Sequence, residues 1–330
     1  MQARPSSNMW WLAALVVAGG GLFGPRPAAA ANPWGADYFP NIELTTQDGK
    51  VVHFYDDLIK GKSVVVNLIY THCTNTCPLE TAKLRQVQKI LGDKVGKDVF
   101  FYSITLDPTR DTPEVLKAYM EKFHVAPGWT FLTGKKEDIK VLAKKLGLSS
   151  INDSFTNDGH LPTMMMGNEP SGQWMRNSAV DNPRFLAITM SNFFHLKMPL
   201  PTQSYASLQQ LPKIDQGAAL FKSQCAACHT IGGGEGIGPD LANVTKRRDR
   251  RWVTRYISEP DKVLNEKDPI AVELFKKYKN VRMPNLSNGP DEVAGLIEYI
   301  EKQSEAGAKQ KASAQAETKS PAGSPPAGEH

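Results

Sequence analysis

The chain has 330 residues, of which 41% are hydrophobic, and a formal net charge of +5 at pH 7. At roughly 150 residues per domain, this length predicts about two domains. The mild charge excludes the dense basic surface typical of nucleic-acid-binding proteins, so we expect no nucleic acid as a partner. Four cysteines are too few for a disulfide-stapled fold. Their arrangement as two close pairs, Cys73/Cys77 and Cys225/Cys228, favours functional sites.

Residues 1–31 are predicted to be a signal peptide. Arg4 precedes an apolar stretch at residues 9–23, and small residues near Ala30 offer a cleavage site. The stretch is shorter than the about 20 apolar residues that a membrane-spanning helix needs. Retention of this segment as a membrane anchor is the alternative. In either case we expect the chain from residue 32 onward to face an extracytoplasmic compartment.

Residues 32–195 are predicted to form an α/β domain. The continuous apolar runs at 63–70 and 99–106 have the length and composition of buried parallel strands. Amphipathic helices are predicted after Pro78, after Pro113 and over 136–146, and residues 161–176 predict two strands joined by a turn at Pro170–Gly172. Strands that alternate with helices indicate a sheet covered by helices.

The remaining chain changes character. Residues 196–212 lack periodicity and are bracketed by prolines, which predicts a linker. Residues 213–302 are predicted to form a mainly α domain whose last helix contains the segment DEVAGLIEYIEKQ. Residues 303–330 have almost no large apolar side chains and are predicted to be a disordered tail.

The segment CAACH, residues 225–229, has the pattern of covalent c-type haem attachment. Cys225 and Cys228 can reach the two vinyl groups of one porphyrin, and His229 can ligate its iron. A zinc site would need two further Cys or His ligands nearby, but the next histidine is the terminal His330. Met283 is the one methionine after His229 and is predicted to be the second axial ligand, as in haem electron carriers.

The segments CAACHTIGGGEGIGPDL, RRWVTRYISEP and KNVRMPNLS together resemble class I cytochromes c. This resemblance covers residues 213–302 and implies a cytochrome c domain with one covalent haem, in which Pro239 packs beside His229. The basic segment 245–251, TKRRDRR, is either a solvated face or a docking site for an acidic partner.

Cys73 and Cys77 could form a structural disulfide, a redox pair or part of a metal site. An exported chain that carries haem needs reduced thiols until attachment, which favours a compartment with thiol-handling proteins, such as a bacterial periplasm. The pair follows a predicted strand and precedes a predicted helix, and a helix N-terminus is expected to lower a cysteine pKa. Two soft thiolates favour Cu(I), and imidazole suits Cu(II).

A third copper ligand is expected among five histidines. His72 adjoins Cys73 and is expected to point away, and His124 ends a predicted helix. His53 and His195 show no local sign of a site. His160 lies in a polar loop before a predicted strand, which makes it the best candidate.

The segments YTHCTNTCP and ITLDPTRDTPEVLKAYMEKF, with the later GH before a strand, resemble the Sco/SenC family. This resemblance covers about residues 40–195 and implies a thioredoxin-like fold and copper ligation by Cys73, Cys77 and His160. The family usually has aspartate directly before this histidine, but here Gly159 intervenes. Met164 and Met166 share a predicted strand face, either as core residues or as auxiliary ligands.

The resemblances imply an exported copper chaperone that delivers copper to, or prepares, the dinuclear copper centre of a terminal oxidase. Its expected partners are the copper-bearing oxidase subunit or its assembly factors, and a redox partner for the haem. The alternatives are a thiol–disulfide oxidoreductase with Cys73 and Cys77 as its catalytic pair, and a redox or copper sensor. We expect a metallochaperone and electron carrier rather than an enzyme, with oxidoreductase activity as the open alternative.

Overall fold

The computed structural model describes residues 33–73, 76–149, 162–198 and 215–319. The predicted signal peptide, His160 and most of the predicted linker lie outside the described residues. Within the described part of the chain, no helix is both long enough and apolar enough to cross a membrane.

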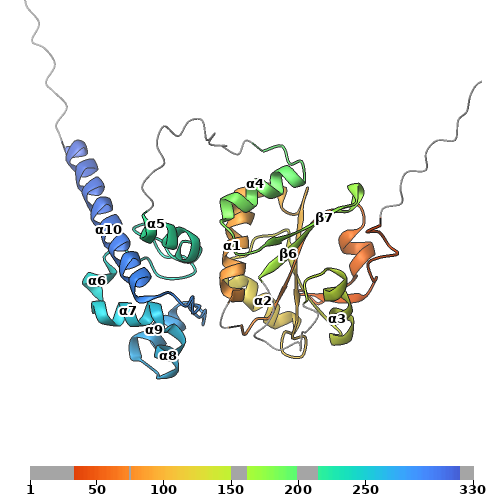
Figure 1. Ribbon diagram of the computed structural model, residues 1–330, viewed down its shortest axis with the longest axis horizontal. Coiled ribbons are helices and arrows are strands. Elements are labelled where there is room, and N and C mark those ends of the chain that lie inside the picture. The colour runs from red at the N-terminus through yellow and green to blue at the C-terminus, as the bar shows by residue number, and fades with distance from the viewer. Residues whose placement is uncertain (1–32, 74–75, 150–161, 199–214, 320–330) are drawn as a thin grey trace, which may run out of the picture. The chain divides into compact units, whose positions relative to one another are not determined.

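Residues 33–198 fold around a seven-stranded sheet with the order β2-β1-β5-β4-β3-β6-β7 (Figure 1). Strand β3 pairs in parallel with β4, and β4 pairs in parallel with β5, whereas β1, β6 and β7 run antiparallel to their neighbours. The strands are β1 (Glu43–Thr46), β2 (Val51–His53), β3 (Ser63–Ile69), β4 (Phe100–Thr105), β5 (Trp129–Gly134), β6 (Thr163–Asn168) and β7 (Gln173–Ser178).

Helices cover both faces of this sheet, as Figure 1 shows. In β3, Val65 and Ile69 face a core built with α1, α2 and α4, and the alternate residues Val64 and Val66 face a core built with η1 and α3. This alternation explains the continuous apolar run, because β3 is buried on both sides. The helices are η1 (Phe54–Ile59), α1 (Thr76–Leu91), η2 (Gly92–Lys94), α2 (Pro113–Lys122), α3 (Lys136–Lys145), η3 (Glu169–Ser171) and α4 (Pro183–Phe193).

Local signals in the sequence set several element ends. The Thr112 side chain caps α2 by accepting from the Val115 amide, and Pro113 occupies the first turn. Gly172 adopts a left-handed φ of 68° in the turn between β6 and β7, where the sequence predicts one. Helix α1 begins at Thr76, so Cys77 belongs to its first turn instead of preceding it.

Residues 215–319 are helical, as predicted for the second part of the chain. The phenylalanine and leucine side chains of α5 and η5 pack with Leu296 and Ile300 of α10. The helices are α5 (Gln216–Leu220), η5 (Phe221–Cys225), α6 (Val244–Arg247), α7 (Arg250–Ser258), α8 (Pro260–Asn265), α9 (Pro269–Lys277) and α10 (Pro290–Lys319).

Helix α10 corrects the prediction of a disordered tail. It continues past residue 302 to Lys319, so residues 303–319 are helical, and residues 320–330 lie outside the described residues. The segment lacks large apolar side chains, but it is rich in alanine, lysine, glutamine and glutamate, which have high intrinsic helix propensity. Propensity and continuity with the packed part of α10 therefore outweigh the lack of a core in this segment.

The crossing of α5 and α10 requires glycine at one position. A Cβ atom on Gly217 would collide with the Gly295 carbonyl oxygen and lie 2.8 Å from the Tyr299 Cβ. We predict that Gly217→Ala lowers the free energy of unfolding of this domain by about 1–3 kcal/mol, because the backbones must separate. Thermal unfolding of the haem-loaded protein, followed by haem absorption, measures this change.

Gly295→Ala is the matched control, because a Cβ at Gly295 has no neighbouring atom within 4 Å. It should leave stability unchanged or raise it by up to about 1 kcal/mol through helix propensity. Equal destabilisation by both substitutions would contradict the close crossing.

Candidate functional site

Cys73 and Cys77 lie where β3 passes into α1. Cys73 ends a turn in which its amide donates to the Tyr70 carbonyl at 3.3 Å, and Cys77 lies in the first turn of α1. Both carry free thiols, both are buried, and they form a small cluster with Tyr70. The two cysteine side chains lie in contact within this cluster. The fold thus brings the two cysteines of the first predicted pair together.

Burial raises the pKa of the Cys77 thiol well above its ordinary value, and the hydrogen bond and charge of Cys73 raise it further. The sequence-based expectation of a lowered cysteine pKa is therefore wrong for Cys77 in the metal-free protein. Its side chain is completely buried, so the desolvation cost of a thiolate exceeds the stabilisation that the N-terminus of α1 supplies.

Tyr119 of α2 lies against the other side of this pair. Its hydroxyl donates to the Cys77 carbonyl at 3.4 Å and lies 2.9 Å from the Thr81 hydroxyl. Burial raises the pKa of Tyr119 well above its usual range, so the phenol stays protonated and available as a donor. Sequence reasoning assigned Tyr119 no role, because an apolar helix stripe gives no sign of a buried hydroxyl.

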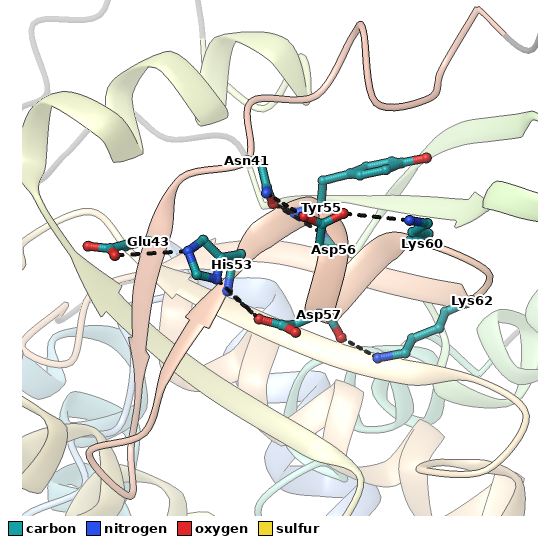
Figure 2. Close-up of polar contacts among 8 residues, drawn as sticks. All are labelled: Asn41, Glu43, His53, Tyr55, Asp56, Asp57, Lys60 and Lys62. Atoms are coloured by element: carbon teal, nitrogen blue, oxygen red, sulfur yellow. Dashed lines mark hydrogen bonds and ion pairs between the residues drawn. The ribbon is translucent and has the colours of Figure 1, made fainter.

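The structure describes four of the five histidines considered as copper ligands. His53 is half exposed, and its Nε2 lies 3.9 Å from a Glu43 carboxylate oxygen and its Nδ1 3.5 Å from an Asp57 carboxylate oxygen. Figure 2 shows these three side chains. His72 points to the loop after β4, where its Nε2 lies 3.4 Å from an Asp107 carboxylate oxygen. His124 and His195 follow the ends of α2 and α4 with a left-handed φ of 53°.

The third copper ligand stays a prediction. Among the residues that the structure describes, no cluster of three or more His, Cys, Asp or Glu side chains could hold a metal ion. His160 lies outside them. Met164 and Met166 are completely buried in the core between the sheet and α1, which confirms their interpretation as core residues.

The haem-attachment pattern forms a tight turn after η5. The amides of Cys228 and His229 both donate to the Cys225 carbonyl, at 3.0 and 2.9 Å. His229 Nδ1 lies 2.9 Å from the Pro239 carbonyl oxygen. Burial lowers the pKa of His229, and the bond to Pro239 raises it by a smaller amount. The imidazole is therefore neutral, with Nδ1–H donating to Pro239, which leaves Nε2 free to ligate a metal.

Gly238 and Asp240 shape the loop beside His229, and sequence reasoning gave neither a role. A Cβ on Gly238 would lie 2.6 Å from the His229 Cε1, so only glycine leaves room for the ring. The Asp240 carboxylate accepts from the amides of Gly232, Gly234 and Ala242 at 2.7–2.8 Å. Burial raises the pKa of Asp240, but these amide bonds together lower it below its usual value.

A cavity between these elements fits a haem. It has a smaller and a larger lobe, and Cys225, His229 and Met283 line both. Most of the remaining lining is apolar, as a porphyrin ring requires. Trp252 Nε1 is buried without a hydrogen-bond partner and lines the larger lobe together with Arg247 and Arg248. An orphaned donor next to two guanidinium groups suits a haem carboxylate.

The haem implied by this cavity would be held by Cys225 and Cys228 through thioether bonds and by His229 and Met283 through the iron. It would supply one-electron redox chemistry when bound. The side chains of this chain orient it, with Pro239 fixing the His229 tautomer and the apolar lining excluding water.

The chain was compared with known proteins. A family model described as SCO1/SenC matches residues 32–165, and one described as Cytochrome c matches residues 214–304. A SCO2-like protein of Rickettsia felis is 36% identical over 105 residues, which are 32% of this chain and 49% of that protein.

Solved structures give similar matches. A SCO1/SenC family lipoprotein from Bacillus anthracis is 28% identical, with a TM-score of 0.41, over 48% of this chain and 97% of its own. Arabidopsis thaliana ScoI, solved with copper bound, is 23% identical, with a TM-score of 0.40, over 48% of this chain and 98% of its own.

We predict that Met283→Ala lowers the reduction potential of the haem by on the order of 0.1 V, because the axial ligand is a main determinant of that potential. Redox titration followed by haem absorption measures the change. Met120→Ala serves as control, since Met120 packs against the core of the other domain. An unchanged potential in Met283→Ala would show that another group ligates the iron.

The predicted fold class is confirmed by these findings, with a sheet covered by helices in the first part of the chain and a helical second part. The chain spans about half the length of the curated relatives it matches. The chain thus contains a segment, residues 32–165, that matches the SCO1/SenC family model, followed by a segment, residues 214–304, that matches the Cytochrome c family model.

Proposed function

We propose that this protein binds copper through Cys73, Cys77 and His160 and delivers it to, or redox-prepares, the dinuclear copper centre of a terminal cytochrome oxidase. The observation that carries the proposal is the buried cluster of Cys73 and Cys77 within the segment that matches the SCO1/SenC family. A static disulfide would stabilise the fold little, because it would close only a short loop.

The burial of the pair suits a soft metal ion. The Cys77 thiol, whose pKa burial raises, gives up its proton when copper binds, because the cation replaces the proton as the positive partner of sulfur. Thiolates prefer Cu(I), and an added imidazole extends the site to Cu(II). His160 supplies this imidazole in our proposal, which follows the Sco/SenC resemblance.

The c-type haem acts in this proposal as the electron-transfer partner of the copper site. A histidine–methionine pair holds a haem at a relatively high potential and leaves no open position on the iron. Such a haem exchanges single electrons without binding substrate. It could exchange electrons with copper or with the cysteine pair, so that the site stays ready for loading.

We further propose a periplasmic location, reached through the signal peptide 1–31 or with that segment retained as an anchor. The partners are then the copper-bearing subunit of the oxidase or its assembly factors, and a redox protein that docks near the haem. On this view the chain is a metallochaperone and electron carrier.

A thiol–disulfide oxidoreductase is the second candidate. The contact between the Cys73 and Cys77 thiols favours it, since two adjacent thiols can close into a disulfide after a small movement. The two functions differ in their need for a third ligand. Copper binding requires His160, whereas disulfide exchange requires only the two thiols.

Anaerobic competition titration with Cu(I) tests the proposal on the full, haem-loaded chain. We expect one tightly bound copper per haem, with affinity reduced at least about tenfold in His160→Ala and about a hundredfold or more in Cys77→Ser, because each removes a ligand. Haem absorption gives the protein concentration in the same sample.

His124→Ala is the matched control, because His124 follows the C-cap of α2 and belongs to no group of possible metal ligands among the described residues. It should bind copper like the wild type. If His160→Ala also binds like the wild type, the copper site does not use this histidine, and the cysteine pair is better explained by disulfide exchange.

A further inference from the structure

A buried carboxylate links the loop after β4 to the loop that carries Cys73. Asp111 is completely buried, and it accepts hydrogen bonds from the Thr71 amide at 3.1 Å and the Thr71 hydroxyl at 2.5 Å. The Thr105 hydroxyl at the end of β4 donates to the same carboxylate. Three donors therefore compensate the cost of burying this group.

Thr71 determines where Cys73 lies. It is the first central residue of the turn that the Cys73 amide closes on the Tyr70 carbonyl. Fixing both the amide and the side chain of Thr71 leaves this turn little freedom. The second central residue, His72, extends toward the same loop, with its Nδ1 4.0 Å from Asp111.

Cys77 is fixed by the same segment of the chain. Thr112, next to Asp111, caps α2, and Tyr119 three residues before the end of that helix donates to the Cys77 carbonyl. One segment, residues 111–119, thus holds the two cysteines through two separate contacts. We call this segment the brace.

We propose that Asp111 is a positioning residue that sets the separation of the Cys73 and Cys77 sulfur atoms by fixing Thr71. The brace contacts both the turn that ends at Cys73 and the first turn of α1, and the two cysteines lie in one buried cluster. Its function is to preorganise the pair, which lowers the entropy cost of joining both sulfurs to one metal ion or to each other. This deepens the proposed function, since the pair is the copper-binding pair.

A hydrogen bond to Asp111 that only stabilises the fold should not affect the position of the cysteine pair. Thr105 makes a bond of the same kind to the same carboxylate, but it lies at the end of β4 and does not belong to the cysteine turn. Loss of the Thr105 bond should cost stability alone. Loss of the Thr71 bond should cost stability and also loosen the pair. The two threonines therefore form a matched test.

The test measures the dithiol–disulfide equilibrium of the full chain against dithiothreitol, without copper and with the haem held ferrous under argon. Cys73 and Cys77 lose two protons and two electrons and form a disulfide. Oxidised dithiothreitol accepts these two protons and two electrons and is reduced to the dithiol. Alkylation and mass spectrometry quantify both forms, and thermal unfolding is measured on the same variants.

We expect the equilibrium constant for disulfide formation to fall about fivefold in Thr71→Val and about tenfold or more in Asp111→Asn, because the two thiols are then less well aligned. Thr105→Val should lower thermal stability and leave the constant within twofold of the wild type. Thr71→Val keeps the carboxylate, so it tests the inference even if Asp111→Asn does not fold.

An unchanged constant in Thr71→Val, or an equal fall in Thr71→Val and Thr105→Val, would overturn the positioning role. The measurement contains no copper, so its outcome is independent of whether the wild type binds the metal. Failure of the copper titration with an intact Thr71 effect would remove the chaperone function and leave the brace as a device of a thiol redox pair.

Discussion

The parallel pairing of β3 with β4 is the constraint on which the first site depends. Its register places Ile69 opposite Thr105, and the Leu106 amide extends the ladder by donating to the Ile69 carbonyl at 2.7 Å. The two strands therefore end side by side. The loop with Cys73 and the loop with Asp111 begin at the same edge of the sheet. The short side chain of Asp111 can therefore contact residues of both loops.

A polar network inside the sheet supports the same region. The Asn67 side chain of β3 donates to Glu80 at 2.9 Å and accepts from Ser103 at 2.6 Å, and the Trp129 indole donates to Ser103 at 2.9 Å. All four side chains are buried. The network joins α1 to three neighbouring strands just behind Cys77, so the helix that carries this cysteine cannot rotate freely about the sheet.

The sequence predicts the elements whose pattern is local. Strands β3 and β4 follow from continuous apolar runs, and α2 follows from its cap and its proline. The short strands β1 and β2 were not predicted, because they are held by pairing with each other and with β5. The sequence predicted a lowered pKa for Cys77, but burial raises it. No local sequence pattern indicates that Tyr70 and the core bury this thiol. Cys225, His229 and Met283 line the same cavity, and their role as haem ligands stays a prediction.

The two parts of the chain carry complementary chemistry. The first holds two buried thiols side by side, and the second offers a neutral His229 and an apolar cavity for a one-electron cofactor. The central claim is that copper binds the cysteine pair. X-ray absorption at the copper edge of the Cu(I)-loaded protein tests it most directly. Our account predicts two sulfur neighbours and one nitrogen neighbour, and the loss of one sulfur in Cys77→Ser. A first shell of nitrogen and oxygen without sulfur would contradict it.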